Sequence, residues 1–125
     1  MNADITRTRE FYRTVPTEDL CSCSYCKNYY RQIRSAYPEL AAYLAALGAD
    51  IEKPLETSPL EPDDGGMLEY CACQYILFGH CPEKFHRHIG NVECRITNSH
   101  PKLRLNEDFF VLEFFPIRLP WQPDT

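Results

Sequence analysis

The sequence has no hydrophobic run long enough to cross a membrane. Its longest apolar stretches lie near Ile76–Phe78 and Phe109–Phe115, and both have the length of a strand, whereas a membrane-spanning helix needs about 20 apolar residues in succession. The N-terminal segment MNADITRTREFYRTVP also lacks the apolar core that follows the basic start of a secretory signal. We therefore expect no membrane association and a cytoplasmic location.

Motifs that bind phosphate groups are missing as well. Gly65-Gly66 is not followed by the lysine and helix of a phosphate-binding loop. The formal net charge is −5 at pH 7, and an acidic surface repels the phosphate backbone of nucleic acids. Arg7, Arg9 and Arg13 oppose this balance, but Thr and Glu lie between them, which is typical of a solvated surface. We expect no nucleic-acid partner.

A recognisable catalytic pattern is also lacking. The four histidines and the paired carboxylates fall in predicted loops, where such side chains are usually solvated. A catalytic Cys–His pair would require Cys81 to lie beside His86 or His88, with a carboxylate such as Glu83 to orient the imidazole. Nothing in the sequence requires this arrangement, so a non-enzymatic role is favoured.

Cysteine, by contrast, is abundant. The chain has seven cysteines, an odd number that leaves at least one thiol without a partner in the chain. Without a secretory signal the expected compartment is reducing, which favours free thiols or metal ligands over a disulfide framework. The 125 residues, 44% of them hydrophobic, fit a single domain over 1–125 that can fold without a metal ion.

The helical region is predicted over residues 24–48. Its apolar residues recur at steps of three and four, which places them on one face of a helix; they are Tyr30, Ile33, Tyr37, Leu40, Leu44 and Leu47. Pro38 interrupts the pattern and predicts either a kink or two helices, about 24–36 and 38–47. Gly48 is expected to end the second helix in a left-handed conformation.

Strands are predicted on both sides of this region. Residues 5–15, rich in Thr and aromatic residues, predict a strand, and a cysteine-bearing loop follows at 17–24. Residues 49–66 form an irregular connection with a short edge strand. Antiparallel strands occupy 67–119, where Pro116 should bend or end the last one. The prediction is an α+β fold with an antiparallel sheet of about four to five strands, packed on one face by a kinked helix or helical hairpin.

The segment before the helical region is the main candidate for chemistry. Cys21, Cys23 and Cys26 form a Cys-x-Cys-x-x-Cys motif, and three thiolates in six residues can reach one metal ion. Zinc usually takes about four thiolate or imidazole ligands. The fourth is predicted to be Cys73, since Cys71 and Cys73 alternate and should share one strand face.

Three further interpretations remain open. The loop that carries His80-Cys81 and His86-Arg87-His88 could supply the fourth ligand in place of Cys73, and His86 and His88 would share a face if extended. Cys23 and Cys26 form a Cys-x-x-Cys motif at an expected helix N-terminus, where the helix dipole stabilises a thiolate, so a thiol redox site is the second interpretation.

The third interpretation is structural. Ser22 or Ser24 would cap the helix while Cys21 and Cys26 pack beneath it. Asn28 would hold the loop through backbone hydrogen bonds. The remaining cysteines would be small buried hydrophobic residues; they are Cys71, Cys73 and Cys94.

The motif Cys-x-Cys-x-x-Cys-x-Asn-Tyr that begins at Cys21, together with Leu47-Gly-Ala-Asp and Lys53-Pro54, resembles a family of small bacterial proteins of unknown function. The resemblance covers about the first half of the chain. It implies a bacterial intracellular setting and carries over no catalytic or binding residue.

These observations favour a non-enzymatic module that binds a protein partner and holds a structural zinc ion at the cysteine cluster. The acidity, the small size and the many tyrosines suit protein binding, and an immunity-type role against a toxin would fit the same composition. The alternative is a thiol oxidoreductase that uses Cys23 and Cys26.

Overall fold

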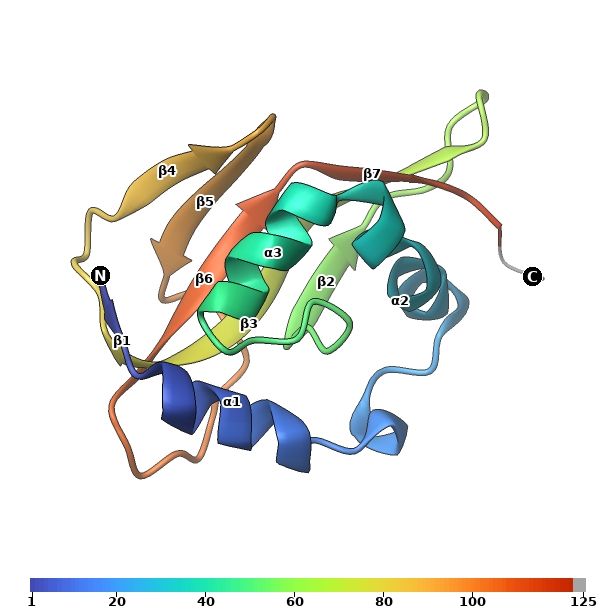
Figure 1. Cartoon of the computed structure of the whole chain (residues 1–125). Helices are drawn as coiled ribbons and strands as arrows, with labels where there is room; N and C mark the ends of the chain where they lie inside the picture. Colours follow the sequence, from blue (N-terminus) through green and yellow to red (C-terminus); the bar gives the residue numbers. More distant parts are fainter. Residues whose placement is uncertain (123–125) are drawn as a thin grey trace.

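The computed structural model describes residues 1–122 and shows an α+β fold in which helices cover one face of a curled antiparallel sheet, as predicted (Figure 1). The helical elements are α1 (Ile5–Thr14), a 3-10 turn (Thr17–Asp19), α2 (Ser24–Ala36) and α3 (Pro38–Ala46). The strands are β1 (Asn2–Ala3), β2 (Glu56–Pro59), β3 (Met67–His80), β4 (His86–Ile89), β5 (Val92–Thr97), β6 (Phe109–Phe115) and β7 (Ile117–Pro120).

Strand β3 is the centre of the sheet. The strands follow the order β1-β3-β6-β5-β4, and β2 and β7 also pair with β3. Every pairing is antiparallel. The core between the helices and the sheet combines strand and helix residues that are at most 1% exposed; they include Tyr29, Ile33, Leu44, Tyr75 and Leu112.

The prediction of a strand at residues 5–15 is wrong, because this segment forms α1. Asp4 caps the helix by accepting a hydrogen bond from the Arg7 backbone N–H at 3.0 Å. Thr8 and Tyr12, one turn apart, are the buried residues of the helix. The Tyr12 hydroxyl donates to the Ile76 carbonyl at 2.9 Å, so contacts with β3 override the strand preference of Thr and aromatic residues.

The helical region divides into two helices as expected. Pro38 is the first residue of α3, where its missing N–H costs no hydrogen bond. Gly48 follows α3 with φ +90°, in the left-handed conformation that was predicted. The absence of a Cβ also lets α1 approach, since a Cβ there would lie 2.5 Å from the Ile5 carbonyl oxygen.

Two irregularities shape the strand region. Pro116 separates β6 from β7, which confirms that it bends or ends the last strand. Opposite β2, the register shifts between Thr57, which pairs with Cys73, and Pro59, which pairs with Tyr70. One extra residue in β3 reverses the alternation of its faces. Cys71 is therefore exposed while Cys73 is buried, and the prediction that they share a face is wrong.

Candidate metal centre

Three cysteines meet where the loop after the 3-10 turn enters α2: Cys21 lies in the loop, Cys23 at the N-cap and Cys26 in the first turn of the helix. The sulfur atoms of Cys21, Cys23 and Cys26 all lie within 4.8 Å of one another, and all three are free thiols. Leu20 alone lies between the 3-10 turn and Cys21, and Ser22 alone lies between Cys21 and Cys23. The sequence motif therefore forms a cluster in space.

Cys23 is the N-cap of α2. Its Sγ accepts a hydrogen bond from the Cys26 backbone N–H at 3.4 Å. Partial burial raises the pKa of Cys23, but hydrogen bonds from the backbone of Cys26 and Tyr25 and with the thiols of Cys21 and Cys26 outweigh it, so the pKa is lowered overall. Neither Ser22 nor Ser24 caps the helix, because Cys23 occupies that position itself.

Cys26 has the opposite environment. Its side chain is 8% exposed, and its Sγ lies 3.4 Å from Thr57 Oγ1 of β2. Burial raises the pKa of Cys26 to about 12, although the hydrogen bond with Thr57 opposes the change. Cys21, in contrast, is exposed, so of the two cysteines expected to pack beneath the helix only Cys26 does so.

The first turn of α2 is fixed by buried polar contacts. The Tyr70 hydroxyl of β3 donates to the Tyr25 carbonyl at 2.6 Å. Asn28 is fully buried and donates to the Pro120 carbonyl at 3.0 Å, while its Oδ1 accepts from the Gln122 backbone N–H at 2.9 Å. Asn28 thus bonds to backbone groups as expected, but it holds the C-terminal segment rather than the cysteine loop.

The sulfur spacing fits one mononuclear site. With Zn–S bonds of about 2.3 Å, tetrahedral geometry separates two thiolates by about 3.8 Å, and small side-chain rotations close the difference from the observed spacing. A [4Fe–4S] cluster would require thiolates farther apart, because each would bind a different iron. The donor set is therefore that of a soft or borderline single ion such as zinc.

Within residues 1–122, Cys73 does not join this group, since the sulfur atoms within 4.8 Å of one another are those of Cys21, Cys23 and Cys26. Cys73 is fully buried, and burial raises its pKa despite a hydrogen bond with Tyr29. The core position of the thiol fits the structural interpretation, as does that of Cys94. The same interpretation is wrong for Cys71, which is exposed.

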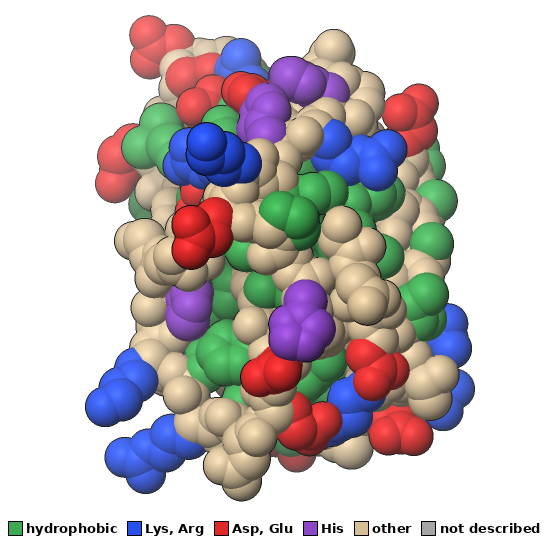
Figure 2. All heavy atoms as spheres, turned by 90° about the vertical axis from the view of Figure 1, so that its left-hand side faces the viewer, with side chains coloured by type: hydrophobic (Ala, Val, Ile, Leu, Met, Phe, Trp, Pro, Cys, Tyr) green, Lys and Arg blue, Asp and Glu red, His purple; other side chains and the backbone are tan. Residues whose placement is uncertain are grey.

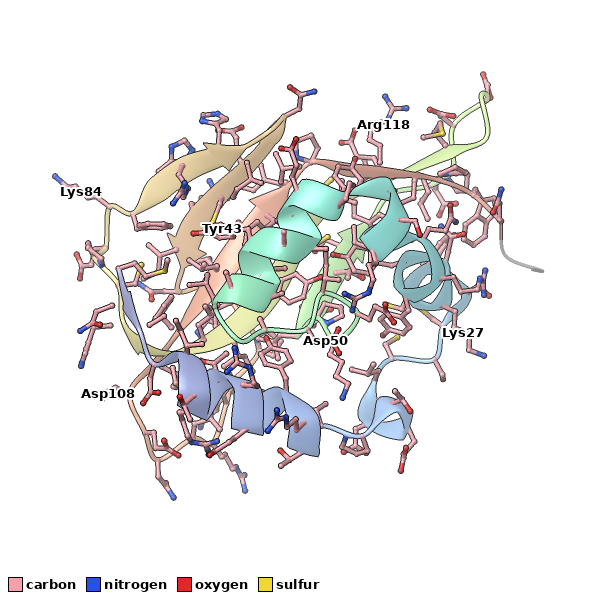
Figure 3. The ribbon with its side chains drawn as sticks, viewed as in Figure 1. Lys27, Tyr43, Asp50, Lys84, Asp108 and Arg118 are labelled. Atoms are coloured by element: carbon pink, nitrogen blue, oxygen red, sulfur yellow. The ribbon has the colours of Figure 1, made fainter. Side chains whose placement is uncertain are left out.

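The alternative fourth ligands are also placed elsewhere. His86 and His88 lie on the β4–β5 hairpin, where they meet Glu93 rather than the cysteines. A small cavity of about 120 Å³ adjoins the cluster and is lined in part by Cys21, Cys26 and Tyr30. Lys27 extends outward from the first turn of α2 (Figure 3). The cluster thus offers three protein ligands and an approach for a fourth from outside.

Comparison with known proteins assigns no family to the chain. The chain matches no protein-family model, no curated protein and no solved structure. Among residues 1–122, no helix has both the length and the apolar character needed to span a bilayer.

Proposed function

We propose that this protein is a non-enzymatic, protein-binding module that holds zinc through Cys21, Cys23 and Cys26. The observation that carries the proposal is the convergence of three free thiols within 4.8 Å at one loop. Three protein ligands leave one position of a tetrahedral site open. Because Cys21 and Cys23 are exposed, a donor from a partner protein can reach that position.

The chemistry of the loop suits such a site. Zinc binds thiolates, so each thiol must lose its proton on binding. The lowered pKa of Cys23 reduces this cost, whereas the raised pKa of Cys26 increases it. Affinity should therefore rise steeply with pH as the buried thiol is deprotonated.

The metal content of the purified protein tests the proposal. We expect about one zinc per chain by mass spectrometry, and chelation should expose three additional reactive thiols. The triple variant C21S/C23S/C26S should lose the zinc. Cys71→Ser, which removes an exposed thiol outside the cluster, is the matched control and should retain it. Absence of zinc after metal loading, or equal loss in the control, would refute the site.

Protein binding is tested separately by cross-linking in cells followed by mass spectrometry. Cross-links between a partner and residues 17–24 should be present in the wild type and in Cys71→Ser, and should be lost in the triple variant. Cross-links that persist in the triple variant would separate partner binding from the cysteine cluster.

A second candidate function is a thiol oxidoreductase, favoured by the contrast between exposed Cys23 and buried Cys26. The Cys23 thiolate would attack a substrate disulfide, forming a mixed disulfide and releasing one substrate thiolate. The Cys26 sulfur, after loss of its proton, would then attack Cys23 Sγ and release the second thiolate. Two electrons pass to the substrate, and a Cys23–Cys26 disulfide remains on the protein.

This candidate predicts a trapped intermediate. With a model disulfide, Cys26→Ser should accumulate a mixed disulfide at Cys23, whereas the wild type should release it. Among residues 1–122 the strand pairings are antiparallel, and no βαβ unit of the kind in which thioredoxin-like motifs occur is present. For this reason we place this function second. Because the Cys21 thiol also lies within 4.8 Å and could release the adduct, the decisive variant is C21S/C26S. Failure of this double variant to trap the adduct would exclude the function.

A further inference from the structure

A second group of metal-ligating side chains lies on the β4–β5 hairpin, away from the cysteine loop (Figure 1). Cys26 contacts β2, and the strand order from β2 to β4 runs through β3, β6 and β5. Four steps of about 4.8 Å, roughly 19 Å measured along the sheet, lie between these strands, and the ligand atoms within 4.8 Å of one another fall into two separate groups. The two groups therefore cannot share one ion.

Strand register brings the group together. His88 pairs directly with Glu93, and His86 pairs with Arg95, two residues farther along β5. Residues two apart on a strand share a face, so both imidazoles lie on the same side as Glu93. His86 Nε2 is 3.1 Å and His88 Nε2 is 3.8 Å from the same Glu93 oxygen, Oε1.

We propose that His86, His88 and Glu93 form a binding site for a borderline divalent cation of the class of Zn²⁺, Ni²⁺, Co²⁺ or Cu²⁺. Bonds of about 2.0–2.1 Å to nitrogen and oxygen separate tetrahedral ligands by about 3.4 Å, and the two observed distances bracket this value. Imidazole with carboxylate suits these ions. Open coordination positions remain for water.

The hairpin holds these side chains before any ion binds. Arg87, between the two histidines, points to the other face and lies 5.0 Å from the centre of the Tyr43 ring. Tyr43 belongs to α3 and lies between that helix and the hairpin (Figure 3). The imidazole rings are 5.2 Å apart with planes at 86°, so they converge on Glu93 rather than stack.

The site is open to solvent. The side chains of His86, His88 and Glu93 are 46%, 61% and 41% exposed. Figure 2 shows histidine and acidic side chains together on the face that carries the hairpin. An ordinary ion pair would need only one imidazole, as in the exposed pair of His80 with Asp108 at 3.4 Å. Convergence of a second imidazole on one oxygen distinguishes the hairpin group.

The test uses the variant C21S/C23S/C26S, which removes the cysteine cluster and makes the result independent of the zinc function proposed above. Zn²⁺ is titrated while the histidine ring signals are followed by NMR. The signals of His86 and His88 should shift and saturate at one equivalent, and those of His80 and His100 should stay unchanged.

Single substitutions in the same background identify the ligands. His86→Ala, His88→Ala and Glu93→Gln should each weaken Zn²⁺ binding at least about tenfold, since losing even an outer-sphere partner of a ligand costs about 10- to 100-fold. His80→Ala is the matched control and should bind as the parent does. Unchanged thermal unfolding of these surface variants shows that each is folded.

Co²⁺ provides an independent readout. Binding at the hairpin gives visible absorption without a sulfur-to-cobalt charge-transfer band. Such a band would place the ion on a remaining cysteine and overturn the proposal. Equal shifts of all four histidines, or unchanged affinity in His86→Ala, would overturn it too.

Discussion

Removal of the Asn28 amide should loosen the attachment of α2 to the end of the sheet. This fully buried side chain donates to the Pro120 carbonyl at 3.0 Å and to the Tyr70 hydroxyl at 3.3 Å. It accepts from Gln32 Nε2 at 2.8 Å and from the Gln122 backbone N–H at 2.9 Å. Asn28→Ala deletes all four hydrogen bonds.

The expected cost follows from these partners. Each hydrogen bond contributes about 0.5–1.5 kcal/mol net, which gives about 2–6 kcal/mol for four. Pro120 keeps a second donor, because Gln32 Nε2 also lies 2.8 Å from its carbonyl oxygen. Tyr70 keeps its bond to the Tyr25 carbonyl. The loss of stability should therefore lie in the lower part of the range, about 2–3 kcal/mol.

Urea unfolding of the metal-free protein measures this loss. Gln32→Ala, which removes a more exposed member of the same network, is the matched control and should cost less than about 1 kcal/mol. Zinc affinity should fall in Asn28→Ala, because the first turn of α2 carries Cys26. A change in unfolding free energy below about 0.5 kcal/mol for Asn28→Ala would refute the role assigned to this network.

Three other predictions concern single positions. Gly48→Ala should cost at least about 2 kcal/mol in urea unfolding, because φ is +90° and the new Cβ would lie 2.5 Å from the Ile5 carbonyl oxygen. An unchanged free energy of unfolding would show that α1 can move away from the new Cβ. Arg95→Ala should cost about 2–3 kcal/mol of stability, because it removes the 2.8 Å ion pair with the buried carboxylate of Glu113. This cost is below the 3–5 kcal/mol of a fully buried pair, since Arg95 is 55% exposed. In thermal unfolding, the double variant Glu113→Gln/Arg95→Ala should regain part of the stability that Arg95→Ala loses. In the metal-free protein, Cys23 alkylation should reach half its maximal rate at a lower pH than in the urea-unfolded chain, because hydrogen bonding lowers the pKa of the folded thiol and the thiolate is the reactive form. The same pKa shift stabilises the fold above the unfolded pKa, and this stability is lost as pH falls through the folded pKa. Coincident alkylation profiles of the folded and unfolded chains would contradict the prediction.

The α2–α3 region could be predicted because every local signal agrees there. Apolar steps of three and four define the buried face, Pro38 suits the first turn of a helix, and Gly48 suits its end. Burial follows the periodicity in part: Ile33, Leu40 and Leu44 are buried as predicted, whereas Tyr30, Tyr37 and Leu47 are half-buried. Tyr29 and Asn28, which the predicted face leaves out, are fully buried. The cysteine cluster could be predicted for a similar reason, since short loops keep neighbouring thiols together.

Segment α1 shows where local preference fails. Thr8 and Tyr12 favour a strand individually, yet both hydrogen-bond to β3, through Phe78 and Ile76 respectively. These contacts, with residues 64 and 70 positions away, stabilise the helix against the strand preference of its residues. A signal did exist, because Asp4 is a good N-cap residue and buried Thr8 and Tyr12 are four apart. The periodicity of ten residues was too short to outweigh composition.

The Cys71–Cys73 pair shows a different limit. Alternation predicts one shared face, but a register shift opposite β2 changes which side chains point inward. Such a bulge depends on how two distant strands pair, so neither strand reveals it alone. His86 and His88 show the opposite case. The register of β4 and β5 is regular, so the two histidines share a face as predicted and both lie beside Glu93.

The third thiol decides between the two functions proposed for the cysteine loop. A dithiol redox pair needs only Cys23 and Cys26, and a further thiol within 4.8 Å competes for the same mixed disulfide. A metal centre uses all three sulfurs. Metal binding deprotonates all three thiols, and the bound cation then neutralises the thiolates and offsets their mutual repulsion at this spacing. The position of Cys21 therefore favours metal binding, although the helix N-terminus that lowers the pKa of Cys23 would serve either chemistry.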